Sequence, residues 1–284
     1  NIATRGLQAD LNGRIWFTDP SDLSGTTIGI NATAAAGQSQ PIYYPPAAGG
    51  FGLPPSAGCN VYAFGSGTFY EKSQRINGPN TGTEGGAETY FIPSLFFAAN
   101  DKARYGDEIA AGRILQIPLK TILRPERCTA AAFALNECSA VTTDIAFYGA
   151  TLSPLSQLTG APLLLIDPSG ALPSKGIFVV YDPTVGCNGA SYAVTVDWKT
   201  NGCDAPLTVR EGTILPPSGD PGGAVVQTTF AGFGVASGLT SVGDHVFTGI
   251  AGLGSDAAGL YGILGGANLG APVDFKPIWW KELK

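Results

Sequence analysis

Two stretches decide the fold class of this chain, Gly176-Ile-Phe-Val-Val-Tyr181 and Tyr192-Ala-Val-Thr-Val-Asp-Trp198. Successive side chains of an extended strand point to opposite faces. In the second stretch every other residue, from Tyr192 to Trp198, is therefore apolar and shares one face. The first stretch is apolar on both faces, which is expected where a sheet packs against other sheets on each side. The two stretches predict stacked β-sheets.

Similar short runs, bounded by Gly, Pro, Asn and Asp, recur on both sides of these stretches and predict further strands. The predicted strands are Arg14–Thr18, Pro41–Tyr44, Val61–Gly65, Tyr90–Ala98, Gly112–Pro118, Thr143–Tyr148, Pro162–Ile166, Gly176–Tyr181, Tyr192–Trp198, Leu207–Glu211, His245–Ile250, Tyr261–Leu264 and Phe275–Trp280. Helical periodicity is nearly absent, and the two short candidates are Asp107–Gly112 and Cys128–Leu135. About a dozen short strands predict a propeller, a sandwich or a barrel. We expect residues 1–284 to form a single all-β domain.

The composition supports many short strands and excludes several classes of partner. The 284 residues include 40 Gly and 21 Pro, which suit tight turns, and only 13% are charged, against about 25% in an average protein. The net charge is −6 and the basic residues are scattered, so a nucleic-acid or anionic-membrane surface is not expected. The chain contains no run of about 18 apolar residues, so the sequence predicts no membrane span.

The cysteine pattern predicts disulfides rather than a metal site. The chain has one His and five cysteines, Cys59, Cys128, Cys138, Cys187 and Cys203. No two cysteines form a C-x-x-C pair, so a zinc site is not expected. The spacing predicts two local disulfides, Cys128–Cys138 and Cys187–Cys203, of the kind that close loops and hairpins in exported proteins. Cys59 is then left over, either buried and inert or bonded to another polypeptide.

The residues that could carry catalysis form no recognisable constellation. His245 lies in a turn that leads into a strand, and the adjacent Asp244 would point to the opposite face. Ser66, in Gly65-Ser-Gly-Thr68, is not followed by a helix and reads as a tight turn. The Gly-rich stretches lack the Lys-Ser/Thr of a phosphate loop, and no calcium-loop spacing of aspartates occurs. We therefore predict a non-enzymatic protein without a catalytic, cofactor or metal site.

Three motifs occur in a suggestive order. The first is Leu7-Gln-Ala-Asp-Leu-Asn-Gly-Arg-Ile-Trp-Phe-Thr-Asp19, where Asn12-Gly13 predicts a type I′ hairpin turn and Trp16 is expected to cap a core. The second is Val61-Tyr-Ala-Phe-Gly-Ser-Gly-Thr-Phe-Tyr-Glu-Lys-Ser73, and the third is Ile278-Trp-Trp-Lys-Glu-Leu-Lys284. In order and approximate spacing these motifs resemble the C-terminal propeller region of PilY-type type IV pilus tip adhesins.

The resemblance implies a degenerate or partial β-propeller of short antiparallel strands with long loops. It also implies an extracellular place at the pilus tip, a part in pilus assembly or extension and in surface adhesion, and minor pilins or other tip subunits as partners. Many members carry a calcium loop just before the first motif, and this chain does not, so a calcium role cannot be carried over. Family members are also longer. An open sheet edge would recruit a second chain that completes the propeller, and Cys59 would suit a bond to it.

Two other functions fit parts of the sequence. A structural subunit of an extracellular filament or sheath fits the low charge, the Gly-rich composition and the spare cysteine. A quinone-dependent propeller enzyme is suggested by fold analogy alone.

Overall fold

The computed structural model of the chain is built mainly from antiparallel strands. In the part of the chain that it describes, the only α-helix is α1 (Ala32–Ala36), and no helix there is long enough to cross a membrane. The predicted all-β class is therefore confirmed. The described residues are 6–19, 22–51, 58–68, 92–126, 147–166, 174–199, 203, 208–209, 226–242, 245–251 and 259–264.

The strands form four sheets, here numbered I to IV in chain order, and one two-stranded ribbon. Sheet I contains β1 (Gly6–Ala9), β2 (Arg14–Asp19) and β3 (Asp22–Asn31). Sheet II contains β4 (Ala47–Phe51), β5 (Cys59–Gly65), β6 (Ser94–Asp101) and β7 (Leu115–Pro118). Sheet III contains β10 (Gln157–Leu158), β11 (Leu163–Leu165), β12 (Ser174–Asp182), β13 (Ala190–Lys199), β14 (Thr208–Val209) and β15 (Val226–Phe233). Sheet IV contains β16 (Val235–Val242), β17 (His245–Ala251) and β18 (Gly259–Leu264), and the ribbon contains β8 (Leu123–Glu126) and β9 (Phe147–Thr151).

Sheet III is four strands wide, although six strands contribute to it. Both β10 and β11 pair with β12, through Leu158 opposite Val180 and Leu163 opposite Ile177. On the far side, β14 and β15 pair with different parts of β13. Like sheet II, sheet III therefore has the width of four antiparallel strands. Three 3₁₀ turns lie between β6 and β8: η1 (Lys102–Arg104), η2 (Ala111–Arg113) and η3 (Leu119–Thr121).

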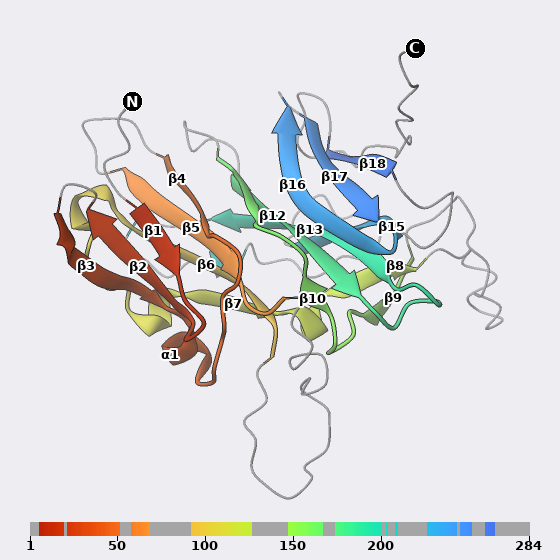
Figure 1. Ribbon diagram of the computed structural model, residues 1–284, viewed down its shortest axis with the longest axis horizontal. Coiled ribbons are helices and arrows are strands. Elements are labelled where there is room, and N and C mark those ends of the chain that lie inside the picture. The colour runs from red at the N-terminus through yellow and green to blue at the C-terminus, as the bar shows by residue number, and fades with distance from the viewer. Residues whose placement is uncertain are drawn as a thin grey trace, which may run out of the picture.

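The four sheets stack face to face in chain order, as Figure 1 shows from β1–β3 at one end to β16–β18 at the other. Three hydrophobic cores separate them, here named by the sheets that they join. The I–II core includes Ile15, Phe17, Ile30, Tyr62, Phe64 and Phe96. The II–III core includes Ala63, Leu95, Phe97, Phe178, Val180, Tyr192, Val194 and Val196. The III–IV core consists of Ile177, Val179, Ala193, Ala231, Ala236, Val246 and Ile250.

Period-2 alternation sends neighbouring residues of one strand into different cores. In β5, Tyr62 belongs to the I–II core and Ala63 to the II–III core. In β12, Ile177 belongs to the III–IV core and Phe178 to the II–III core. A strand that is apolar on both faces therefore lies in a sheet that is covered on both faces, as the sequence predicts. The predicted shared face of β13 is confirmed for its members in the II–III core, Tyr192, Val194 and Val196.

The strand predicted over Pro41–Tyr44 is wrong. This segment crosses between sheets I and II, where the N–H of Ile42 donates to the carbonyl of Asp10 and the carbonyl of Pro41 accepts from Gly67. These are single crossing bonds and not a ladder, so the segment joins no sheet. The short helix predicted over Asp107–Gly112 is also wrong, since only the 3₁₀ turn that begins at Ala111 forms there.

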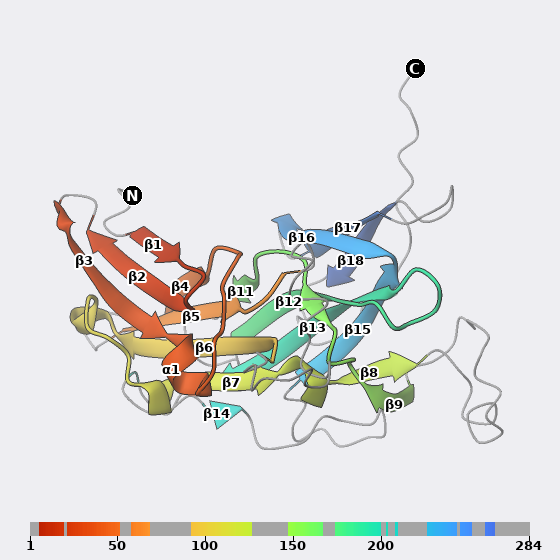
Figure 2. The same cartoon turned by 60° about the horizontal axis from the view of Figure 1, so that its bottom comes forward.

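One edge strand of each sheet lies in succession along the stack. Figure 2 shows β1, β4, β11 and β16 in succession. Strand β4 contacts β11, and Gly160, between β10 and β11, lies against Gly238 of β16, where an added Cβ would meet the Gly238 Cα at 2.6 Å. The described sheets form an open stack, and no closed ring of sheets is present among them.

Candidate functional site

The hairpin between β1 and β2 is organised by the carboxylate of Asp10. Its Oδ1 accepts from the N–H groups of Asn12 and Arg14, each at 2.9 Å. The Asp10 backbone accepts from the N–H of Gly13 at 3.2 Å and donates to Arg14 at 2.9 Å. The loop thus has three residues, with Gly13 at φ 78°. The predicted two-residue type I′ turn is wrong, because the Asp10 side chain favours a turn that ends in a left-handed glycine.

Trp16 does not cap a core, contrary to the sequence prediction. Its β2 neighbours Ile15 and Phe17 enter the I–II core, so Trp16 points to the outward face of sheet I. There it is half-buried, and its indole N–H donates to Oδ2 of Asp10 at 2.9 Å. Asp10 therefore fixes both the turn and the orientation of this aromatic side chain.

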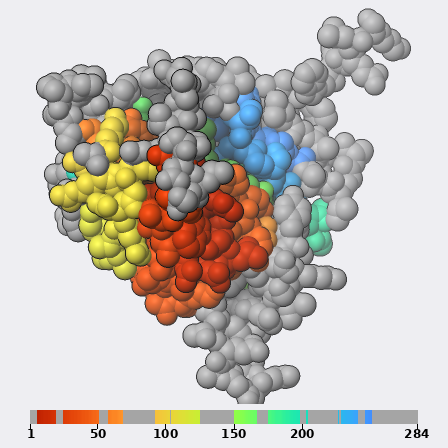
Figure 3. Space-filling view, turned by 60° about the vertical axis from the view of Figure 1, so that its left-hand side comes forward, coloured from red at the N-terminus to blue at the C-terminus, as the bar shows by residue number. Residues whose placement is uncertain are grey.

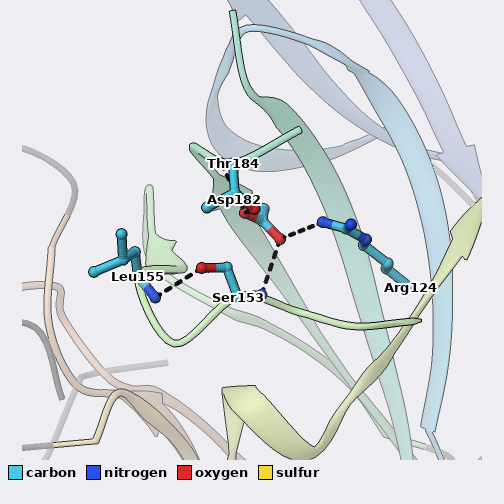
Figure 4. Close-up of polar contacts among 5 residues, drawn as sticks. All are labelled: Arg124, Ser153, Leu155, Asp182 and Thr184. Carbon is cyan, nitrogen blue, oxygen red and sulfur yellow. Dashed lines mark hydrogen bonds and ion pairs between the residues drawn. The ribbon is translucent and has the colours of Figure 1, made fainter. Parts of the chain in front are cut away.

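The side chain of Asp182, at the end of β12, accepts four hydrogen bonds (Figure 4). Its carboxylate is fully buried. One oxygen accepts from Nη1 of Arg124 and the N–H of Ser153, both at 2.9 Å. The other accepts from the N–H of Thr184 at 3.0 Å and its hydroxyl at 2.7 Å. Because Arg124 lies on β8, Asp182 ties the ribbon to sheet III.

The geometry of Asp182 suits a structural role. Two ionised oxygens offer about four lone-pair directions, and four protein donors occupy them here. No direction is left for a substrate proton or a metal ion. No group of three or more His, Cys, Asp or Glu side chains that could hold a metal ion occurs among the described residues.

Ser66 is likewise structural, as its sequence context predicts. It is buried, donates its hydroxyl to Oε1 of Gln40 at 2.6 Å, and accepts from the N–H of Ser94 at 3.0 Å. The following Gly67 has φ 81°, which a tight turn requires. These bonds hold the end of β5 against the start of β6. His245 begins β17, but its side chain and Asp244 lie outside what the structure describes.

The disulfide pairing differs from the sequence prediction. Cys203 is bonded to Cys59, with Cα atoms 5.1 Å apart and 144 residues of sequence separation. Cys187 is free and exposed. The predicted Cys187–Cys203 pair is therefore wrong, and Cys59 is not available for a bond to another chain. Cys128 and Cys138 lie outside the described residues, so their pairing stays a prediction.

The strand between Cys187 and Cys203 explains why these two cannot meet. Cys187 lies in the turn before β13 and Cys203 beyond its other end. Ten extended residues span about 33 Å at ~3.3 Å each, whereas a disulfide needs Cα atoms within about 7 Å. The same strand carries Cys203 toward the start of β5 in sheet II, where Cys59 lies. The disulfide thus links sheets far apart in sequence, and Arg113 donates to the carbonyls of Ala99 and Cys203 beside it.

One further polar segment gives no signal in the sequence. Ser156, Gln157 and Thr159, around β10, are buried, yet their side-chain polar atoms make no hydrogen bond. Their pattern, two hydroxyls and an amide between a turn and an apolar strand, is typical of ordinary loops. Only the three-dimensional arrangement shows that these side chains lie inside the molecule.

Comparison with protein-family models, with curated protein sequences and with solved structures gives no match for this chain. The resemblance to PilY-type tip adhesins therefore continues to rest on the three motifs. The first lies on the β1–β2 hairpin. The second is described only as far as Thr68, and the third lies outside the described residues.

Proposed function

We propose that this chain is a non-enzymatic, extracellular module of a type IV pilus tip protein, which supports pilus assembly or extension and surface adhesion. The observation that carries the proposal is the stack of four antiparallel sheets in chain order, headed by the hairpin of the first motif. Such a stack agrees with the partial propeller that the motif resemblance implies, because propeller blades pack face to face around an axis.

The arrangement of these edge strands supports an axis. In a propeller the sheets are arranged radially, so one edge strand of every blade lies near the centre. Here β4 contacts β11, and Gly160, next to β11, lies against Gly238 of β16. These strands each begin, or nearly begin, their sheet. We infer that sheets I to IV are consecutive blades of an open or partial propeller.

The Cys59–Cys203 disulfide supports the extracellular placement. A bond across 144 residues forms and persists in an oxidising compartment, such as the cell exterior, and is rare where glutathione keeps thiols reduced. The bond joins sheet II to the chain beyond β13. It would hold two blades together in a protein that works outside the cell.

The partner that we propose is a pilus-tip subunit, a minor pilin or a second chain that adds a sheet to the stack. Its place is the outward face of sheet I, which Figure 3 shows at the surface of the molecule. Gln8 and Trp16 lie opposite each other on this face, Gln8 exposed and Trp16 half-buried. Within the stack, each pair of neighbouring sheets packs face to face, so a further sheet on this face would repeat the packing seen between sheets I to IV. Because Cys59 is already bonded to Cys203, this contact would not use a disulfide at Cys59.

The test is immunogold labelling and co-purification of the protein with pili sheared from cells that make it. We expect a single tip label and recovery of minor pilins with it. Trp16→Ser should reduce the recovery, whereas Leu11→Ser, which changes a 59% exposed residue at the tip of the same hairpin, should not. Circular dichroism of both variants checks that they fold.

Two results would overturn this function. Regular labelling along a filament would favour the structural-subunit alternative. Recovery of the protein from the cytosol with Cys59 and Cys203 as free thiols would remove both the pilus and the extracellular placement.

A further inference from the structure

The segment Ser153–Gly160 is held tightly at both ends. At its start, the N–H of Ser153 donates to the carboxylate of Asp182. Near its end, the N–H of Thr159 donates to the carbonyl of Val179 at 3.1 Å, and Gly160 packs against Gly238. Because the backbone is fixed on both sides, the segment cannot move out to solvent as a whole without breaking these anchors.

Three side chains in this segment are buried without a hydrogen-bond partner. Ser156, Gln157 and Thr159 are 0%, 1% and 3% exposed. The unpartnered atoms are Oγ of Ser156, Nε2 and Oε1 of Gln157, and Oγ1 of Thr159. Native proteins pair nearly all of their buried polar atoms with protein groups or ordered water, so an unpaired amide and two unpaired hydroxyls in one segment point to a bound molecule.

The side chain of Gln157 can be assigned to one side of sheet III. Leu158 of β10 belongs to the II–III core, so its strand neighbour Gln157 points to the opposite side, toward sheet IV. Gln157 is paired in register with Tyr181 of β12. Tyr181 is in turn paired with Ser191 of β13, which is buried on the same face, so this end of the β12–β13 hairpin carries a polar side chain.

The chemistry of the unpaired atoms selects the ligand. The Gln157 amide nitrogen can only donate, and its oxygen can only accept, while the two hydroxyls do both. A cation would satisfy only the oxygens and an anion only the donors. Water donates and accepts, and it is small enough for a site enclosed on every side. We propose that ordered internal water binds in this segment and satisfies the amide of Gln157 and the hydroxyls of Ser156 and Thr159.

The proposal explains how the segment is tolerated. A buried water typically makes about three hydrogen bonds to polar groups that would otherwise be unpaired, and a protein holds roughly one such water per 27 residues. Here the water would join β10 to the junction between sheets III and IV. That junction is then hydrated, in contrast to the apolar II–III core. This inference is independent of the proposed function.

The first test is a crystal structure of the full chain at about 1.8 Å resolution or better. We expect water within about 2.7–3.2 Å of both Gln157 amide atoms. Oε1 of the equally buried Gln40, which Ser66 already satisfies, is the internal control and needs no water. A protein group bonded to Gln157 in place of water, or an empty site, would overturn the proposal.

A second test is the thermal stability of Gln157→Leu. If water satisfies the amide, leucine removes those bonds and the melting temperature does not rise. If the amide is bare, leucine relieves an unpaired buried group and raises the melting temperature by several degrees, since ~1 kcal/mol corresponds to about 2–4 °C for a chain of this size. A rise of that size contradicts the proposal even if no crystal is obtained.

Discussion

The two faces of the β12–β13 hairpin have opposite chemical characters, although the same two strands form both. The face toward sheet II carries Phe178, Val180, Tyr192, Val194 and Val196, all in the II–III core. The face toward sheet IV carries the pair of Lys175 with Asp197, the buried Ser191 and Thr195, and only Ile177, Val179 and Ala193 in the III–IV core. Alternation along a strand lets one hairpin make a dry, aromatic junction on one side and a smaller, polar one on the other.

The difference predicts where the stability of the stack lies. Ring pairs reinforce the II–III core: Phe97 and Phe178 meet edge to face at 5.5 Å, and Tyr192 meets Phe230 at 5.8 Å. The III–IV core contains no aromatic side chain among its buried residues. Sheets II and III should therefore be joined more strongly than sheets III and IV. Four experiments on the junctions of the stack are given below in order of decreasing expected effect.

The largest effect is expected from Phe178→Ala in the II–III core. A fully buried Phe that is truncated to Ala typically lowers the free energy of unfolding by about 3–5 kcal/mol. Its neighbour Val179 enters the III–IV core, and Val179→Ala is the matched control, with an expected loss of about 2 kcal/mol. Urea denaturation monitored by tryptophan fluorescence measures both. Equal losses in the two variants would contradict the contrast.

Removal of the disulfide should have the next largest effect, because it also holds sheet II to the chain beyond β13. The double change Cys59→Ser with Cys203→Ser should lower the free energy of unfolding by about 2–5 kcal/mol, since the bond closes a long loop. Cys187→Ser, at an exposed free cysteine, should change it by no more than about 0.5 kcal/mol. Peptide mapping without reductant checks the pairing. A Cys187–Cys203 peptide would show that the pairing described above is wrong.

Asp182→Asn should weaken the attachment of the ribbon to sheet III. Asparagine has the same shape, but it lacks the charge that pairs with Arg124 and places an NH₂ group where donors now point. Loss of one partner in a buried ion pair costs about 3–5 kcal/mol. Arg124 is 19% exposed, so we expect a smaller loss, about 2–3 kcal/mol. The measurement is chemical denaturation at constant pH, and an unchanged midpoint would refute the structural role of Asp182.

Ser191→Ala tests the junction of sheets III and IV and should have the smallest effect. The Ser191 hydroxyl donates to the carbonyl of Gly234 at 2.7 Å and accepts from the N–H of Ala236 at 2.9 Å. Its removal leaves two buried backbone groups unpaired and should cost about 1–2 kcal/mol. We expect the loss to appear as faster hydrogen exchange in β16, with β5 unaffected. A uniform change across the chain would indicate that the sheets unfold as one unit.

The sequence predicts the centre of the stack better than its edges. The strands over Val61–Gly65, Gly176–Tyr181 and Tyr192–Trp198 are rich in β-branched and aromatic residues and were predicted within one or two residues of their ends. Strand β4, Ala-Ala-Gly-Gly-Phe, has almost no intrinsic strand preference and forms because β5 offers it a partner. In contrast, β15 contains the alternating run Val226-Gln-Thr-Thr-Phe230, a signal that sequence analysis could have used.

The candidate sites were harder to predict because they depend on which distant segments meet. Spacing alone favoured a Cys187–Cys203 bond, although the strand that the two cysteines bracket holds them apart. The role of Asp182 depends on Arg124, which is 58 residues earlier in the chain. The buried state of Gln157 likewise follows from the anchors of its segment and not from its neighbours in sequence.

Native-state hydrogen exchange, followed by mass spectrometry at peptide resolution, tests the central contrast most directly. It compares the opening free energies of β5–β6, next to the II–III core, with those of β16–β17 in sheet IV. The account predicts that β16 and β17 exchange through a partial opening of lower free energy, while β5 and β6 exchange only on global unfolding. Equal protection of the two regions would contradict it.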